Sequence, residues 1–148
     1  MQKIIIFLLI FFHLTSLQSQ EEYFLTLRHE MVNLRQGPSF DYPVKIYYKK
    51  KFLPVLIQDK SDNFRKIRDH ENNSGWIHIS QLSKKKAAIV IDEKSLIYSK
   101  NTIYSKPLAI TEVGRLLLIR KCKNEWCKIQ SKEIKGWIKR THLWGNLD

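Results

Sequence analysis

Cysteine, glycine and proline are scarce in this chain of 148 residues, and acidic residues are outnumbered. There are 2 cysteines, 5 glycines and 4 prolines, and 14 acidic residues face 26 lysines and arginines, which gives a net charge of +12. A zinc site takes about four ligands, so two cysteines alone are too few. The 5 histidines show no spacing typical of metal ligands. We therefore expect neither a metal site nor a cofactor.

Motifs of common enzymes are also missing. The chain has no G-x-S-x-G, no H-E-x-x-H and no glycine-rich phosphate loop. Its acidic residues show no pairing typical of glycoside hydrolysis. A cysteine nucleophile needs a nearby histidine. Cys127 and His142 lie in the same half of the chain, but Cys122 is a simpler partner for Cys127. We expect the protein not to be an enzyme.

Long apolar runs are confined to the first residues. The apolar run 4–12 follows Lys3 and precedes a small, polar segment at 15–20. This order is typical of a secretory signal peptide, and the run is shorter than the ~20 residues that span a membrane. We predict a signal peptide over residues 1–19, cleaved after Ser19, with an uncleaved anchor as the alternative. The mature chain is expected in the periplasm or cell envelope, without a transmembrane segment.

The excess of positive charge favours a partner with negative charge, such as nucleic acid, an anionic envelope surface or an acidic protein. Export argues against nucleic acid. The alternative is a coding bias of an AT-rich genome, since the longest basic clusters are the lysine runs 49–51 and 84–86. Both runs lie where we expect exposed turns or strand edges.

Cys122 and Cys127 make an even count in a chain predicted to be exported, which indicates one disulfide. The intervening segment 123–126 is polar enough for a hairpin tip, so the two thiols are expected to face each other on adjacent strands. Catalytic thiol chemistry is the alternative.

The chain contains an internal repeat. Residues 75–82, GWIHISQL, return as GWIKRTHL at 136–143, and 64–67 and 55–58 match 126–129 and 117–120. The same alignment places Leu34 opposite Leu96 and Ile46 opposite Leu108. Two homologous units of about sixty residues are indicated, and we predict them over residues 23–83 and 86–145.

Each unit has the pattern of short strands separated by turns. Val44, Ile46 and Tyr48 alternate with polar positions, which predicts that Tyr48 points inward and Tyr47 outward. Turn-forming residues cluster at 36–39, 59–63 and 70–75. Strands in the second unit are expected at 89–91, 96–98, 108–110, 116–120, 126–129 and 136–138. No window sustains a helical stripe, so we predict an all-β protein of two small antiparallel barrels.

The two glycines of the repeated motif, Gly75 and Gly136, are expected where the backbone leaves a turn. A barrel of about sixty residues is marginally stable by itself. We therefore expect the disulfide, and packing between the units, to contribute to stability.

Residues 32–39, VNLRQGPS, resemble the opening of bacterial SH3-like domains, whose first strand runs into an N-[LV]-R-x-G-P-S turn. Such domains usually close with the Gly-Trp-Ile pattern and the turn seen at 75–82. The similarity covers 31–82 well and 89–145 more weakly, since 96–101 in the second unit lacks the Arg, Gly and Pro. The resemblance implies two tandem SH3-like barrels in an exported protein, used as a non-catalytic binding or targeting module, often on cell-wall material.

Ligand-binding candidates are the arginine of the first turn and the exposed aromatics: Arg35, Tyr42, Tyr47, Trp76 and Trp137. In SH3-like barrels the loop that follows Arg35 borders the ligand groove. Aromatic rings stack on sugars or hold an extended peptide. The alternative for Arg35 is local pairing with a carboxylate or carbonyl, while Gly37 and Pro38 set the turn. Trp76 and Trp137 are alternatively core residues.

The most economical function is an exported SH3-like binding module for peptidoglycan stem peptides, another anionic envelope polymer or a partner protein. The alternative is a structural or interaction protein whose two packed barrels bind a secreted or membrane protein. The sequence makes no prediction of oligomeric state.

Overall fold

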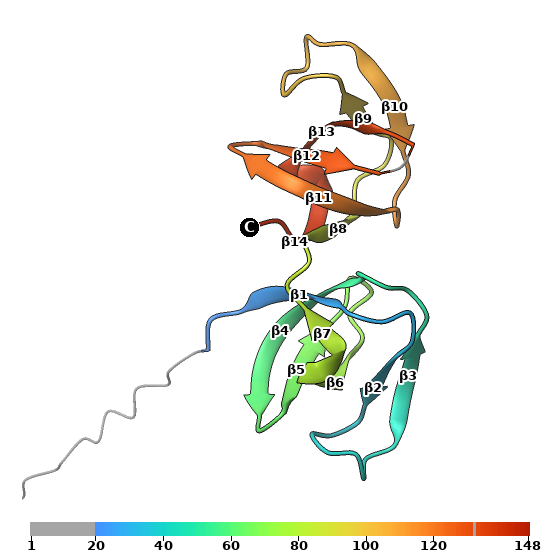
Figure 1. The fold of residues 1–148 in the computed structure, drawn as a ribbon, viewed down its shortest axis with the longest axis vertical. Helices are drawn as coiled ribbons and strands as arrows, with labels where there is room; N and C mark the ends of the chain where they lie inside the picture. Colours follow the sequence, from blue (N-terminus) through green and yellow to red (C-terminus); the bar gives the residue numbers. More distant parts are fainter. Residues whose placement is uncertain (1–19, 132) are drawn as a thin grey trace, which may run out of the picture.

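The computed structural model describes residues 20–131 and 133–148, which form two β-barrels, one above the other in Figure 1. The strands of the first barrel are β1 Tyr23–Leu27, β2 Val32–Arg35, β3 Val44–Tyr48, β4 Pro54–Ser61, β5 Phe64–Arg68, β6 Ser74–His78 and β7 Leu82–Ser83. Those of the second are β8 Ala87–Val90, β9 Ser95–Tyr98, β10 Pro107–Thr111, β11 Leu116–Lys123, β12 Trp126–Gln130, β13 Lys135–Lys139 and β14 Leu143–Asn146. The signal peptide predicted over residues 1–19 lies outside the described residues.

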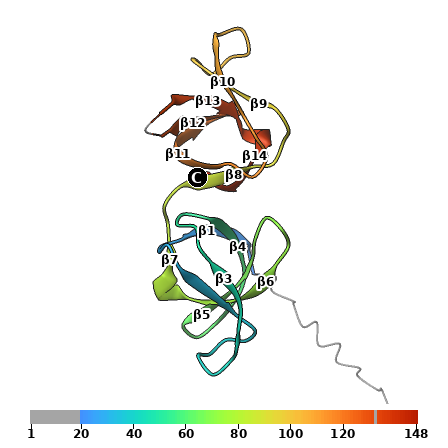
Figure 2. The same cartoon turned by 90° about the vertical axis from the view of Figure 1, so that its right-hand side faces the viewer.

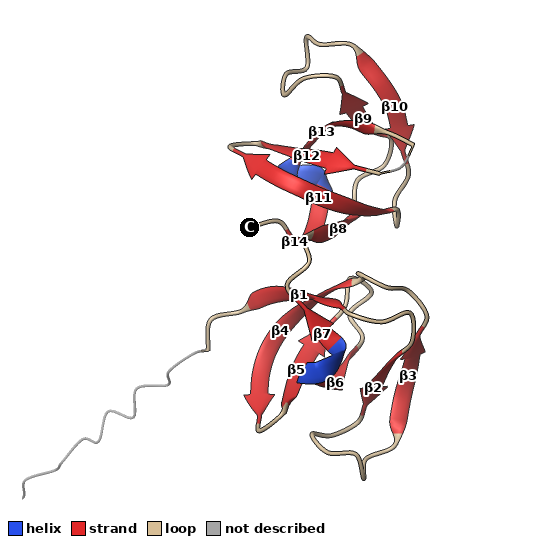
Figure 3. Cartoon of the chain, viewed as in Figure 1, coloured by secondary structure: helices blue, strands red, loops and turns tan. Residues whose placement is uncertain are grey.

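Both barrels have the same topology. Their strand orders are β3-β2-β6-β5-β4-β1-β7 and β10-β9-β13-β12-β11-β8-β14, with antiparallel pairing between neighbours. One turn of 3-10 helix precedes the last strand of each barrel, as η1 Ile79–Gln81 and η2 Arg140–His142. The remainder is strand and loop (Figures 2 and 3). The prediction of an all-β protein with two small antiparallel barrels is confirmed. Within the described residues, no helix is long and apolar enough to cross a membrane.

The core of the first barrel follows from strand alternation. Val32 and Leu34 point inward from β2, and Tyr48 is 8% exposed while its neighbour Tyr47 is 62% exposed, as predicted. The Tyr48 hydroxyl donates a hydrogen bond of 2.8 Å to the buried Asp69 carboxylate. Burial, together with this hydrogen bond, raises the pKa of Tyr48 above its ordinary value.

The repeat alignment needs one correction. Arg35 pairs with Trp76 in the first barrel, whereas Tyr98 pairs with Trp137 in the second. The predicted matches of Leu34 with Leu96 and of Ile46 with Leu108 are therefore wrong by one residue. The true equivalents are Ile97 and Ala109, which face each other as Leu34 and Ile46 do. Since a shift of one residue reverses the faces of a strand, the correction changes which residues line the second core.

Gly75 and Gly136 also differ from the prediction, because they lie inside β6 and β13 rather than at the exit of a turn. A Cβ atom on Gly75 would lie 2.6 Å from the Arg35 carbonyl oxygen, and one on Gly136 would lie 2.8 Å from that of Tyr98. These contacts are shorter than van der Waals distances. Glycine is required here so that β6 and β13 can approach β2 and β9 closely.

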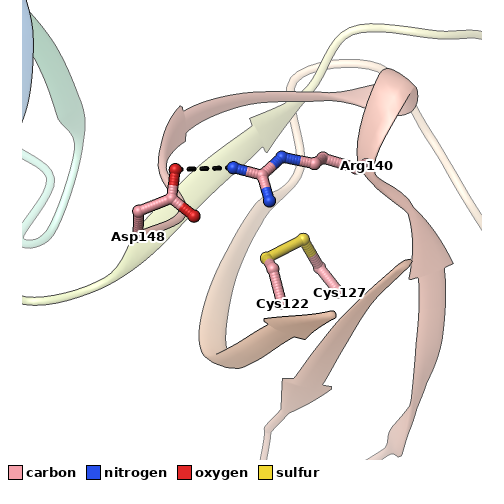
Figure 4. Close-up of a disulfide and its surroundings, with 4 residues drawn as sticks. All are labelled: Cys122, Cys127, Arg140 and Asp148. Atoms are coloured by element: carbon pink, nitrogen blue, oxygen red, sulfur yellow. Dashed lines mark hydrogen bonds and ion pairs between the residues drawn. A yellow bond between two sulfur atoms is a disulfide. The ribbon is translucent and has the colours of Figure 1, made fainter. Parts of the chain in front are cut away.

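The predicted disulfide joins Cys122 on β11 to Cys127 on β12, at directly opposite positions of the hairpin. Figure 4 shows it beside the Arg140–Asp148 ion pair. Because both thiols are used in this bond, Cys127 has no free thiol to act as a nucleophile.

The two barrels pack against each other, as expected from the marginal size of each. The Phe24 ring meets the Trp144 ring edge-on, with centroids 4.8 Å apart. Ile89 is buried within the hydrophobic cluster of the first barrel, and Leu116 packs against it. Across the link, the Asn146 side-chain amide donates to the Lys84 and Lys85 carbonyls.

Candidate functional site

Arg35, the last residue of β2, organises the loop that follows it. Its guanidinium Nη1 donates to the carbonyl oxygens of Phe40 at 3.2 Å and Tyr42 at 2.9 Å. The guanidinium also lies 5.3 Å from the centre of the Phe40 ring, at cation–π distance. These contacts match the alternative expected for Arg35, in which it pairs locally with carbonyl groups. Arg35 thereby fixes the shape of the loop 36–43.

Tyr42 lies at the end of this loop, with its ring against Gly37. A Cβ atom on residue 37 would be 2.5 Å from the ring carbons, so only glycine permits this contact. Tyr42 nevertheless remains 47% exposed. The loop therefore presents an aromatic ring to solvent in a defined position.

An aromatic cluster lies next to the loop. The rings of Phe40, Phe64 and His78 are mutually 5.2 Å apart, and Phe64 and His78 face each other on β5 and β6. Phe40 is 61% exposed and covers Phe64, which is 6% exposed. Sequence reasoning missed these three residues as site candidates. The sequence does indicate one of them: Phe64 begins β5, and an aromatic residue recurs at the equivalent position as Trp126 in β12.

Trp76 occupies the middle of the same outer surface. It lies opposite Arg35 on β2 and opposite Lys66 on β5, so an arginine and a lysine flank the half-buried indole. Tyr47 lies on β3 opposite Asn33, two strands away from Trp76. We name this surface the Trp76 face and define it by its residues: Arg35, Phe40, Tyr42, Tyr47, Lys66, Trp76 and His78.

The second barrel carries an equivalent surface with different chemistry. Trp137 lies opposite Tyr98 and Lys128, and Lys128 Nζ is 5.7 Å from the centre of the Trp137 ring. Tyr98 replaces Arg35 and meets Trp126 edge-on at 5.5 Å. The structure thus brings Arg35, Tyr42 and Trp76 to one surface, with Tyr47 at its edge. Trp137 belongs to a separate surface.

The positive charges of the Trp76 face are not neutralised by ion pairs. Within residues 20–131 and 133–148, the contacts between basic and acidic side chains are Arg140–Asp148 and His142–Asp92, both in the second barrel. Lys45 adds a further cation nearby, with its ammonium group 3.0 Å from the Ser74 carbonyl. No group of three or more potential metal ligands occurs in this described part. The arrangement is suited to an anionic ligand with a flat or extended surface.

Three solved structures that match this chain come from longer proteins. NlpC2 and NlpC1 from Trichomonas vaginalis are each 15% identical, with TM-scores of 0.38 and 0.37; the matches cover 84% and 86% of this chain and 48% and 47% of theirs. An NlpC/P60 family protein from Bacillus cereus is 10% identical, with a TM-score of 0.38 and coverages of 82% and 56%. The chain therefore spans about half the length of these proteins. No curated protein sequence matches it.

The family assignment rests on the sequence profile of the bacterial SH3 domain. This profile matches residues 28–84, in the first barrel, and residues 98–145, in the second. The two segments together make up more than half of the chain, and each lies within one of the two barrels. Domains of this kind are binding or targeting modules, and the Cys122–Cys127 disulfide is compatible with a location outside the cytoplasm. The chain belongs to the bacterial SH3 domain family.

Proposed function

We propose that this protein is an exported, non-catalytic module that binds a cell-wall peptide on the Trp76 face. The observation that carries the proposal is the cross-strand row in which Arg35 and Lys66 flank Trp76. A carboxylate of the ligand would pair with one of these cations while its backbone or a sugar ring lies against the indole. Tyr42 and Tyr47, which are 47% and 62% exposed, extend the contact surface.

The electrostatics supports an anionic ligand of the envelope. The chain carries a net charge of +12, which attracts anionic polymers over a range that salt shortens. Retention on such a polymer is therefore expected to weaken as the salt concentration rises, while the aromatic contact persists.

A sedimentation experiment with purified peptidoglycan sacculi tests the proposal. The disulfide-bonded chain from residue 20 onward is expected to sediment with sacculi at low salt, and Trp76→Ala is expected to weaken the affinity by about tenfold, the effect of losing about 1.4 kcal/mol. The matched control is Tyr104→Ala, which removes another exposed aromatic ring, 92% accessible, in the second barrel. Circular dichroism verifies that each variant is folded. Failure of the unaltered chain to sediment at low salt would exclude the cell-wall ligand.

A second candidate is an interaction protein whose packed barrels bind a secreted or membrane protein. It is favoured by apolar side chains on the outside of the second barrel, where Leu108 and Ile110 are 42% and 66% exposed. This protein would not sediment with sacculi at any salt concentration. The same experiment therefore separates the two functions.

A further inference from the structure

The two barrels differ at a set of core positions that the corrected register identifies. The inward pair Val32–Tyr48 of the first barrel corresponds to Ser95–Thr111 in the second. Ile46 corresponds to Ala109. Each replacement in the second barrel is smaller or more polar, and all three positions lie on β9 or β10.

A fourth replacement follows from the backbone hydrogen bonds. Leu27 N donates to the Leu53 carbonyl, and Val90 N donates to the Arg115 carbonyl, so Leu53 and Arg115 are equivalent. Leu53 is 5% exposed in the first core, whereas the second barrel has an arginine at this position.

A fifth replacement is that of Asp69, the partner of the Tyr48 hydroxyl, by Ser131. The two residues are equivalent because both accept hydrogen bonds from the amides of the loop that follows.

The second barrel is hollow where these side chains are reduced. A groove of about 720 Å³ lies between β10 and β11, and its lining includes Ala109, Thr111, Arg115 and Ser131. Its apolar part comes from Ile97, Leu117, Ile129 and Ile134. The groove therefore occupies the place that Tyr48, Ile46 and Leu53 fill in the first barrel. Its volume lies in the range of about 300–1,000 Å³ that is typical of binding pockets.

The groove borders a free strand edge. Within the described residues β10 pairs with β9 alone and ends its sheet, so one row of its backbone N–H and C=O groups faces the groove side without a strand partner. Ile110 is 66% exposed and lines the groove. Two carboxylates, Glu112 and Glu133, and one guanidinium, Arg115, also line it, although the chain as a whole is strongly basic.

We propose that this groove binds an extended peptide that adds to the free edge of β10. The peptide inserts one aromatic or large aliphatic side chain into the space that Tyr48 fills in the first barrel, and main-chain hydrogen bonds to β10 hold it in register. Basic residues on either side of that side chain pair with Glu112 and Glu133. The site lies in the second barrel and does not depend on the function proposed for the Trp76 face.

Blocked synthetic peptides test this site. A fluorescent peptide Lys-Val-Tyr-Val-Lys is expected to bind the disulfide-bonded chain saturably. The peptides Lys-Val-Ser-Val-Lys and Glu-Val-Tyr-Val-Glu are each expected to bind about tenfold more weakly, because one lacks the apolar side chain and the other reverses the charge. Equal binding of all three peptides, or no saturable binding of the first, overturns the proposal.

Variants of the protein that fill the groove complement the peptide series. The double variant Thr111→Tyr, Ser131→Asp recreates the Tyr48–Asp69 pair and is expected to abolish peptide binding. Ala109→Ile, which restores the residue of the first barrel, is a milder filling variant should the double variant not fold. Ile103→Ser alters an apolar residue that is 51% exposed and does not line the groove, and it is expected to bind normally. Undiminished binding by a folded filled variant overturns the proposal.

Hydrogen exchange tests the strand addition itself. Saturating peptide is expected to slow the exchange of amides in β10, while Trp76→Ala leaves this protection unchanged. Protection confined to the first barrel overturns the assignment to β10. The sacculus experiment tests the Trp76 face and the peptide experiment tests the groove beside β10, so a negative result in one does not affect the other.

Discussion

At the scale of single residues, Asp69 is a buried carboxylate of the first barrel with several hydrogen-bond donors around it. It is 1% exposed, and its carboxylate accepts hydrogen bonds from the Tyr48 hydroxyl, the amides of Glu71 and Asn73, and the Asn73 side chain. A buried carboxylate is tolerated only where such donors replace water. One side chain thereby ties the loop between β5 and β6 to β3.

Removing the Tyr48 hydroxyl tests this constraint. Tyr48→Phe leaves one lone pair of the buried carboxylate without its donor, so we expect the free energy of unfolding at neutral pH to fall by about 1–3 kcal/mol. Urea denaturation followed by circular dichroism measures the change. Tyr47→Phe, at a 62% exposed position, is the control and is expected to change stability by less than about 0.5 kcal/mol. Equal effects of the two variants would contradict the role of the hydrogen bond.

The same pair of variants gives a pH dependence with a defined sign. In the unfolded chain Tyr48 ionises near its ordinary pKa of 10.0, while burial and the Asp69 hydrogen bond raise its pKa in the folded state. Above about pH 10 the folded state therefore binds more protons than the unfolded state, and stability falls as pH rises. Tyr48→Phe is expected to lose stability less steeply over this range than Tyr47→Phe does. Parallel slopes would contradict the raised pKa.

At the scale of elements, the hairpin of β11 and β12 compensates for the reduced core of the second barrel. The disulfide closes a short loop, with a sequence separation of 5 between the cysteines. Loop-closure entropy then gives a stabilisation of about 2 kcal/mol. Replacing both cysteines by serine is expected to lower the free energy of unfolding by about that amount, as measured by urea denaturation. A reducing agent should no longer lower the free energy of unfolding of the cysteine-to-serine variant. If it still does, the disulfide is not the cause of that decrease.

Most strands could be predicted from the sequence because alternation and turn residues mark them, whereas β1, β7 and β14 were not predicted. In the first barrel the alternation of Ile46, Tyr47 and Tyr48 gave both position and orientation. In the second barrel, Leu96 and Ile97 are adjacent and both apolar, so hydrophobicity does not distinguish which faces inward. Their register depends on the pairing of Tyr98 with Trp137, which connects residues far apart in the chain. This is why the repeat alignment was shifted by one residue.

The candidate site could be predicted in part. Arg35 and Trp76 belong to motifs that are readable in the sequence, and Tyr42 follows the first of these motifs by three residues. Phe40 lies in a loop, where no periodicity indicates what a side chain contacts, and its position depends on the fold of the loop around Arg35. His78 joins the cluster only because β6 pairs with β5.

At the scale of the whole molecule, the two barrels differ in how completely their cores are filled. The first has a filled core, with Tyr48 and Leu53 buried, and it presents the Trp76 face. The second has lost bulk at the equivalent positions and contains the groove beside β10. It is supported by its disulfide and by Ile89 and Leu116, which pack with the core of the first barrel. The second barrel therefore depends on the first for part of its stability.

Trp144→Ala tests this dependence. Trp144 is half-buried between the barrels, where it meets the Phe24 ring edge-on and lies 6.3 Å from the His70 ring, centre to centre. Its truncation removes aromatic contacts across the interface, with an expected loss of about 2 kcal/mol. Because the barrels then unfold less cooperatively, differential scanning calorimetry should show a calorimetric enthalpy that exceeds the van't Hoff enthalpy, or two separate transitions.

Trp126→Ala is the matched control for this experiment, because Trp126 is also half-buried but meets Tyr98 within the second barrel. Both substitutions are expected to destabilise the second barrel. Loss of the interface, however, also removes contacts from Phe24 and His70, so Trp144→Ala alone should lower the midpoint of the first barrel. A Trp144→Ala protein that unfolds in one transition at the unaltered midpoint would show that the Trp144 contact stabilises neither barrel. The contact between the barrels would then depend on Ile89 and Leu116, which pack with the core of the first barrel.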